Sequence, residues 1–127
     1  MPDSITVVAA VVERDGAFLV TRRLDGTHLA GMWEFPGGKC DPGESHGACL
    51  AREMREELAV EIRVREKILG VAYDYPERSI ALHFYRCDLA GEPVPQLGQQ
   101  MQWAPRAALR DLDMPPADAD VIELLSR

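Results

Sequence analysis

The sequence has few cysteines, no excess of positive charge and no long apolar run, and each shortage argues against a class of protein. Its three cysteines, Cys40, Cys49 and Cys87, are widely spaced and odd in number. We therefore expect neither a disulfide framework nor a zinc site, and interpret them as buried or half-buried thiols. The formal net charge of −7 argues against a general surface for a nucleic-acid polymer. No apolar run reaches the length that crosses a membrane.

The start of the chain alternates like a β-strand and lacks the basic region of a signal peptide, so we expect a cytoplasmic protein. A chain of 127 residues with 46% hydrophobic content can bury a core of its own. We expect one domain over residues 1–127, and a monomer. The negative charge still permits a small phosphorylated substrate, because a metal ion can supply the missing positive charge.

The first part of the chain predicts a hairpin and then a long loop. Two β-rich apolar runs, residues 5–12 and 17–21, flank Asp15-Gly16, a dipeptide typical of hairpin turns. Residues 24–45 hold five glycines and two prolines, with one short strand-like piece at Met32–Phe35. Loops of this length in a small domain are usually functional.

The second part predicts two strands and two short helices. The strands lie within residues 61–93 and are broken at Tyr75-Pro76-Glu77. A short helix is expected near residue 105, and a closing helix begins at Pro115-Pro116 with Val121, Leu124 and Leu125 as its buried stripe. This order of elements predicts an α/β fold in which helices pack on the faces of a mixed sheet.

Residues 45–58 form the clearest predicted helix, and it carries an unusual number of acids. Ser45 can cap its N-terminus. At about 100° per residue, one apolar stripe forms; its members are Gly47, Leu50, Ala51, Met54 and Leu58. Glu53, Glu56 and Glu57 fall together on a neighbouring face, at a spacing where like charges repel.

These glutamates have two interpretations. Charged helix faces are often simply solvated and contribute little. Three features favour a function: the glutamates converge on one patch, a Gly-Gly turn precedes the helix, and Arg52 with Glu44 can brace the loop against it. A hard divalent cation, Mg²⁺ or Mn²⁺, would offset the repulsion, since it prefers oxygen ligands and can bridge to phosphates.

The same segment resembles the Nudix box. That motif combines a Gly, a Glu and a terminal Arg-Glu-aliphatic-x-Glu-Glu-x-Gly-aliphatic run; the matching residues here are Gly38, Glu44, Arg52, Glu53, Met54, Glu56, Glu57 and Val60. Ala59 departs from it, because the motif has glycine there. Further likeness to the MutT-like subgroup lies in "TRR", "WEFPGGK", "YDYPER" and "PPADADVI".

The resemblance implies an α/β/α sandwich with a mixed sheet between helices, and hydrolysis of a nucleoside triphosphate to a monophosphate and pyrophosphate. By the same resemblance, the Gly37 carbonyl, Glu53, Glu56 and Glu57 bind Mg²⁺. Glu53 is the favoured catalytic base, although the sequence alone does not separate base from ligand among the glutamates. Glu44 pairs with Arg52 to hold the loop.

Five residues are candidate substrate contacts. Arg23, Lys39 and Arg78 carry charges that suit phosphate oxygens, although each has an alternative reading as a solvated surface charge. Phe35 can stack on a base or fill the core. Asp118 can lie on the edge of the bound base, or can simply favour the start of a helix through the helix dipole.

Two positions leave the substrate open. Relatives specific for oxidised guanine carry asparagine where Asp118 stands, and an ionised carboxylate only accepts hydrogen bonds. We expect an oxidised purine nucleotide such as 8-oxo-dGTP, with (d)CTP as the alternative substrate. Leu97 replaces a glutamate that relatives often place near the metal, so the number of metal ions stays open. A non-catalytic nucleotide-binding module is the alternative from outside the enzymes.

Overall fold

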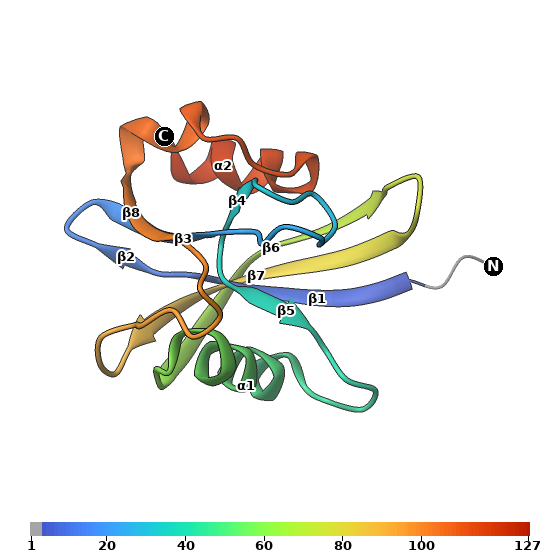
Figure 1. The fold of residues 1–127 in the computed structure, drawn as a ribbon, viewed down its shortest axis with the longest axis horizontal. Helices are drawn as coiled ribbons and strands as arrows, with labels where there is room; N and C mark the ends of the chain where they lie inside the picture. The colour runs from blue at the N-terminus through green and yellow to red at the C-terminus, as the bar shows by residue number, and fades with distance from the viewer. Residues whose placement is uncertain (1–3) are drawn as a thin grey trace.

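Two β-sheets lie between two α-helices, α1 below and α2 above in Figure 1. The computed structural model describes residues 4–127, so residues 1–3 of the expected domain lie outside the described residues. The strands are β1 (Ser4–Val11), β2 (Glu13–Arg14), β3 (Ala17–Arg22), β4 (Trp33–Glu34), β5 (Gly37–Lys39), β6 (Ile62–Asp74), β7 (Ser79–Leu89) and β8 (Met101–Pro105). The helices are α1 (His46–Leu58), the 3-10 helices η1 (Arg106–Asp111) and η2 (Pro116–Asp118), and α2 (Ala119–Leu125).

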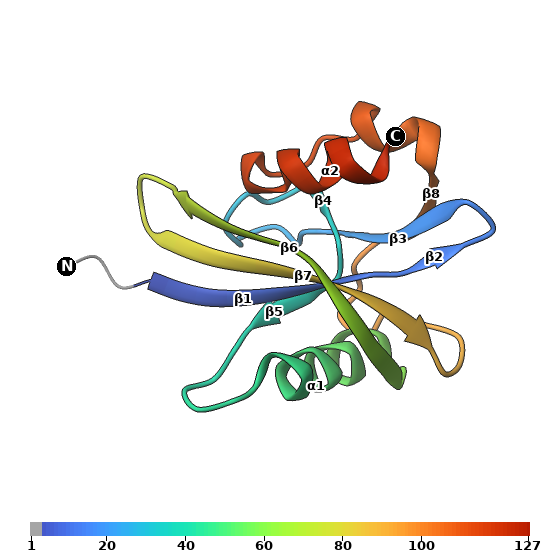
Figure 2. The same ribbon diagram turned by 180° about the vertical axis from the view of Figure 1, so that it is seen from behind.

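The first sheet is mixed, as expected, with strand order β5-β1-β7-β6. β1 and β7 are parallel, and the other two pairs are antiparallel. In the second sheet β3 pairs with β2, β4 and β8, all antiparallel. The view from behind in Figure 2 shows the same layering, which confirms the predicted sandwich with a mixed sheet between helices. The second sheet is antiparallel throughout.

The predicted hairpin is right at its turn and wrong in its first strand. Asp15 and Gly16 take the positive φ angles, 52° and 77°, that a tight hairpin turn requires. The strand that pairs across this turn is the two-residue β2, however. The long apolar strand β1 lies in the other sheet, since it is buried on both faces and pairs with β5 and β7.

Alternation along β1 separates two hydrophobic cores. Ala9 and Val11 belong to the upper core, which also contains α2 residues. Val8 and Ala10 belong to the lower core, which also contains α1 residues. Successive side chains of a strand point to opposite faces of its sheet, so each face of β1 supports one helix. Because both faces of β1 are buried, the register of β1 against its neighbours is fixed, and one of those neighbours is β5.

Helix α1 begins and ends as the sequence predicts. Ser45 is its N-cap and accepts a hydrogen bond from the N–H of Ala48. Its buried residues are Cys49, Leu50, Met54 and Leu58. The predicted stripe is wrong in part, because Gly47 and Ala51 are half-buried and the stripe did not include Cys49. Cys49 is fully buried, in agreement with its interpretation as a buried thiol. The helix is rotated so that its thiol side faces the sheet.

Ala59 ends this helix in the left-handed conformation, with φ 51° and ψ 39°. A Cβ in this region costs energy that glycine avoids. We expect Ala59→Gly to raise the free energy of unfolding by about 0.5–1 kcal/mol, measured by urea denaturation. The control is Ala51→Gly inside the helix, which should lower it by about 1 kcal/mol. A destabilising Ala59→Gly would contradict the assignment of strain.

The C-terminal segment closes the upper core. Val121 and Leu125 are buried as expected, but Leu124 is 39% exposed, because α2 turns only one narrow face to the sheets. The predicted helix near residue 105 is the 3-10 helix η1, and the closing helix begins as η2. Among residues 4–127, no helix is long and apolar enough to cross a membrane.

Candidate functional site

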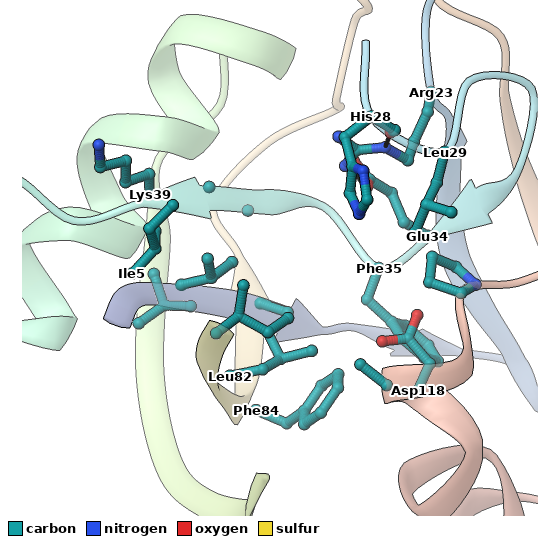
Figure 3. Close-up of a pocket in the computed structure, with 18 of the residues that line it drawn as sticks. Ile5, Arg23, His28, Leu29, Glu34, Phe35, Lys39, Leu82, Phe84 and Asp118 are labelled. Atoms are coloured by element: carbon teal, nitrogen blue, oxygen red, sulfur yellow. Dashed lines mark hydrogen bonds and ion pairs between the residues drawn. The ribbon is translucent and has the colours of Figure 1, made fainter. Parts of the chain in front are cut away.

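A cavity of about 350 Å³ opens beside β1 and β5 (Figure 3). It collects most of the residues that the sequence singled out for metal or substrate: Arg23, Phe35, Gly37, Lys39, Glu53, Glu57, Arg78 and Asp118. Glu44, Arg52 and Glu56 do not line it. Figure 3 shows Lys39 and Asp118 at opposite ends of the cavity, so a ligand must be elongated to reach both.

Glu53 and Glu57, on successive turns of α1, line the cavity with carboxyl groups. Burial raises the pKa of both carboxyls. For Glu57 the pKa rises to about 8, first through burial and then through the negative charges of Glu53 and Glu34. A carboxyl in this state either keeps its proton or needs a cation nearby.

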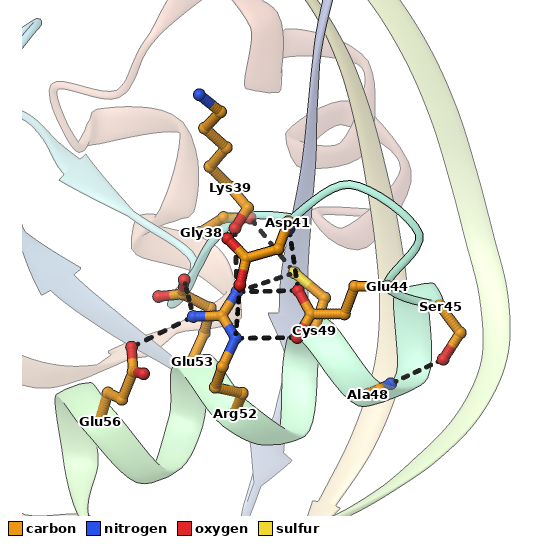
Figure 4. Close-up of polar contacts among 10 residues, drawn as sticks. All are labelled: Gly38, Lys39, Asp41, Glu44, Ser45, Ala48, Cys49, Arg52, Glu53 and Glu56. Carbon is orange, nitrogen blue, oxygen red and sulfur yellow. Dashed lines mark hydrogen bonds and ion pairs between the residues drawn. The ribbon is translucent and has the colours of Figure 1, made fainter.

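Arg52 holds the acidic helix to the preceding loop (Figure 4). Its Nε and Nη2 donate to the two carboxylate oxygens of Glu44 at 2.8 and 2.9 Å, and its Nη2 also donates to the carbonyl of Lys39. The hydrogen bonds from Arg52 are the largest cause that lowers the Glu44 pKa to about 2. The predicted brace between Glu44 and Arg52 is therefore present.

The same guanidinium also orients two of the other glutamates. Its Nη1 lies 2.9 Å from Glu53 Oε1 and 3.2 Å from Glu56 Oε2. The Glu53 side chain is 13% exposed, whereas that of Glu56 is 59% exposed. The three helix glutamates therefore differ: Glu53 and Glu57 line the cavity, whereas Glu56 is exposed outside its lining.

Gly38 leaves the space that Glu53 occupies. A Cβ at this position would overlap the Glu53 carboxylate, whereas a Cβ at Gly47 would meet nothing within 4 Å. We expect Gly38→Ala to displace Glu53 and reduce turnover by about tenfold to a hundredfold, with little loss of stability because a side chain can move aside. The control is Gly47→Ala, which should keep full turnover. Equal kcat values for both variants would contradict the role of this contact.

Glu34 is a cavity residue that no motif in the sequence singled out. It lies at the end of β4 with its side chain half-buried, and burial raises its pKa although it forms an ion pair with Arg23. Arg23 also donates to the carbonyl of His28, so this cation is held in place. The available signal was an acid between two aromatic residues in "WEFPGGK".

Asp118 lies at the far end of the cavity and is only 4% exposed. Burial, and then the charge of Glu34, raises its pKa to about 7. Phe35, also in the cavity wall, packs edge-to-face on Phe84. The Tyr75 hydroxyl accepts the N–H of Ala117 and so holds the turn that carries Asp118. This end of the cavity combines aromatic surface with one buried carboxyl group, that of Asp118, which can donate or accept a hydrogen bond.

Leu97 borders a smaller adjoining hollow of about 160 Å³ together with Glu57, Arg23 and Gln99. Its side chain is 54% exposed. The segment around it is fixed to the end of α1, since Gln99 donates to the carbonyl of Glu57. Leucine offers no ligand atom, so this side of Glu57 has one acid fewer than the resemblance implies.

Comparison with known proteins agrees with this geometry. The model of the NUDIX domain family matches residues 7–124. CTP pyrophosphohydrolase of Escherichia coli is 39% identical over 121 residues, 94% of this chain and 89% of that protein. The 8-oxo-dGTP diphosphatase of Haemophilus influenzae is 35% identical over 123 residues, 95% of this chain and 90% of that protein.

Solved structures agree with the fold. The solution structure of the E. coli ORF135 protein has a TM-score of 0.82 and 37% identity, covering 98% of this chain and 87% of that one. The MutT protein of Methanosarcina mazei has a TM-score of 0.88 at 23% identity, covering 99% of this chain and 95% of that one, and supports the fold alone. The chain therefore belongs to the Nudix family, as a MutT-like pyrophosphohydrolase of the group that includes the 8-oxo-dGTP diphosphatases and CTP pyrophosphohydrolase.

Proposed function

We propose that this protein hydrolyses a nucleoside triphosphate to the monophosphate and pyrophosphate, with 8-oxo-dGTP as its preferred substrate and Mg²⁺ as its cofactor. This activity would remove an oxidised nucleotide before it reaches DNA. The observation that carries the proposal is the shape of one cavity: buried acids from α1 line part of it, and aromatic surface with Asp118 lines the far end. A nucleotide has the matching division into polyphosphate and base.

The donor set fits a hard divalent cation. Glu53 and Glu57 are drawn into the cavity at a cost visible in their raised pKa values, and the cations Arg23 and Arg52 are already paired with Glu34 and Glu44. Carboxylate and carbonyl oxygens are the ligands that Mg²⁺ prefers. We assign the Gly37 carbonyl, Glu53, Glu56 and Glu57 as its ligands. Bound Mg²⁺ would neutralise phosphate charge and lower the pKa of water.

The protein's own groups then position the reactants. Arg52 fixes one oxygen of Glu53 and leaves the other side of the carboxylate toward the cavity. We assign Glu53 as the base that takes the proton of the attacking water, because its raised pKa brings it closer to the working pH. Lys39 and Arg78, both in the cavity wall, would contact the phosphates.

Asp118 would select the base. With a pKa of about 7, it holds a proton in a substantial fraction of molecules at neutral pH. A protonated carboxyl has one donor and one acceptor, the pair that the N7–H and O6 of 8-oxoguanine require. Phe35 would contribute apolar wall to the same end. This buried acid can therefore replace the asparagine of other members.

CTP is the second candidate, and two observations favour it. The E. coli relative at 39% identity is named for CTP. Ionised Asp118 accepts hydrogen bonds, and the cytosine N4 amino group donates them. The balance between the two substrates would then depend on the protonation of one buried group.

The test is pyrophosphate release from a panel of 8-oxo-dGTP, dGTP, CTP and dCTP with Mg²⁺. We expect the highest kcat/KM for 8-oxo-dGTP. Asp118→Asn should raise the ratio of 8-oxo-dGTP to CTP turnover by about tenfold, because an amide keeps its donor at every pH. A higher kcat/KM for CTP would overturn the substrate assignment. Binding of nucleotides without turnover of any would favour a non-catalytic module.

A further inference from the structure

We infer that Cys40, Glu44 and Cys49 form a second metal site, selective for thiophilic divalent cations such as Zn²⁺ or Cd²⁺. The two thiols are nine positions apart and form no CxxC pair, which is why the sequence predicted no such site. The fold brings one ligand atom of each residue to within 4.8 Å of the others. Figure 4 shows Cys49 and Glu44 beside the Arg52 guanidinium.

The spacing of these atoms is close to that of a bound ion. Sulfur ligands lie about 2.3 Å from zinc, so two of them in tetrahedral geometry are about 3.8 Å apart. The distance between the sulfurs therefore needs to contract by about 1 Å at most, and that from each sulfur to the carboxylate oxygen by about 1.3 Å at most, within the reach of side-chain rotation. A water molecule would complete four ligands.

The backbone on both sides of the site is held firmly. The N–H of Cys40 donates to the carbonyl of Thr6 on β1 at 2.9 Å. Cys49 lies on the second turn of α1 and is 0% exposed. The N–H of Asp41 donates to Glu44 Oε1 at 2.9 Å. The donors are thus gathered before any ion arrives, which reduces the entropy lost on binding.

Charge also favours a cation here. Two thiolates and a carboxylate around a divalent ion leave one net negative charge. Arg52 supplies the compensating positive charge, since its Nη2 lies 3.8 Å from Cys49 Sγ and 2.9 Å from Glu44 Oε1. Mg²⁺ does not compete, because it avoids sulfur ligands.

Occupation of this site would affect catalysis through the brace. An ion that takes one Glu44 oxygen removes one of the bonds that fix Arg52, and Arg52 in turn orients Glu53. This consequence rests on the proposed function, whereas binding itself does not. A thiophilic cation would therefore inhibit the Mg²⁺-dependent reaction.

The experiment is titration of the reduced protein with CdCl₂. Excess Mg²⁺ is present so that it, rather than Cd²⁺, occupies the glutamates assigned as magnesium ligands. The absorption of thiolate–cadmium charge transfer should saturate at one ion per chain, with release of protons to the solution. It should be lost in Cys40→Ser and in Cys49→Ser. Cys87→Ser is the matched control, because Cys87 is also buried in the lower core but lies outside the cluster.

Turnover gives the second measurement. One equivalent of Cd²⁺ should lower turnover of the parent by about tenfold and leave Cys40→Ser unchanged, as expected when a residue that orients a ligand is disturbed. Absence of the charge-transfer band, or its survival in both serine variants, would overturn the site. Failure of all nucleotide turnover, with the band present, would count against the proposed function alone.

Discussion

Glu57→Gln is expected to reduce turnover by about a hundredfold or more while the protein stays folded. Glutamine keeps the shape of the side chain but removes the charge that a cation needs. Glu57 lines both the main cavity and the adjoining hollow, where burial, and then the negative charges of Glu53 and Glu34, raise its pKa more than the charge of Arg23 lowers it. Loss of this ligand should therefore raise the Mg²⁺ concentration needed for half-maximal rate as well as lower kcat.

Glu53→Gln should lose turnover to a similar degree through a different route. Arg52 Nη1 lies 2.9 Å from Glu53 Oε1, and the Glu53 carboxylate packs against Gly38. These two contacts fix the position of the Glu53 carboxylate. If it is the base, kcat should fall even at saturating Mg²⁺, and the acidic limb of the pH–rate profile should disappear. The comparison of the two variants separates base from ligand.

The control for both is Glu61→Gln. Glu61 forms an exposed pair with Arg55 just beyond α1, away from the cavity. Circular dichroism and urea denaturation would show that each variant is folded. Near-full activity of both Glu53→Gln and Glu57→Gln, with an unchanged requirement for Mg²⁺, would show that the acidic face of α1 is only a solvated surface.

Local signals predicted the part of the site that lies on one element and its preceding loop. Ser45 as N-cap, the end of α1 at Leu58 and the pairing of Glu44 with Arg52 depend on residues at most eight positions apart. Spacing along a helix fixes which side chains meet. The sequence carried this information directly, and the structure confirms it.

Contacts between distant segments could not be obtained in this way. Glu34 meets Glu57 and Asp118 only because β4, α1 and η2 converge on one cavity. The partner of β1 was wrong for a related reason: a turn dipeptide locates a turn but does not choose which strand returns to it. Pairing depends on which faces are buried, and that is a property of the whole sheet.

The metal-free protein is expected to lose stability as the pH rises from 6.5 to 8.5. In the folded state Glu57 has a pKa of about 8 and Asp118 one of about 7, against ordinary values of 4.5 and 3.8. Over this range the folded state binds more protons than the unfolded state, so the free energy of unfolding falls with pH. The protons on Glu57 and Asp118 stabilise the folded state fully at a pH below the ordinary pKa values. This stabilisation is lost as the pH rises through the folded-state pKa values of about 7 and 8.

Other groups do not reverse this sign inside the chosen range. The pKa of Glu44 is lowered to about 2, so its contribution changes only in acid. Burial lowers the pKa of His83 from its ordinary value of 6.5, so the unfolded state holds more of this proton at the lower end of the range. This contribution opposes the fall by about 0.4 kcal/mol at most and does not reverse it. Burial raises the pKa of Cys87 to about 12, from 9.0, so its effect begins only at the upper end of the range and has the same sign as that of the carboxyls. The two cavity carboxyls therefore set the slope.

Urea denaturation in a metal chelator at pH 6.5, 7.5 and 8.5 measures this effect. We expect a fall of about 1–3 kcal/mol across the range. Glu57→Gln, which is expected to reduce turnover, should remove much of the slope and make the metal-free protein more stable at pH 8.5. Mg²⁺ should stabilise the parent most at pH 8.5, because Glu57 is then already ionised and need not lose a proton to bind the ion. It should stabilise Glu57→Gln much less. A flat or rising stability in the parent, or an unchanged slope in Glu57→Gln, would show that the strain attributed to this carboxyl is absent. The expected result places stability and activity in opposition at one residue, because the charge that destabilises the metal-free protein is the charge that binds the ion.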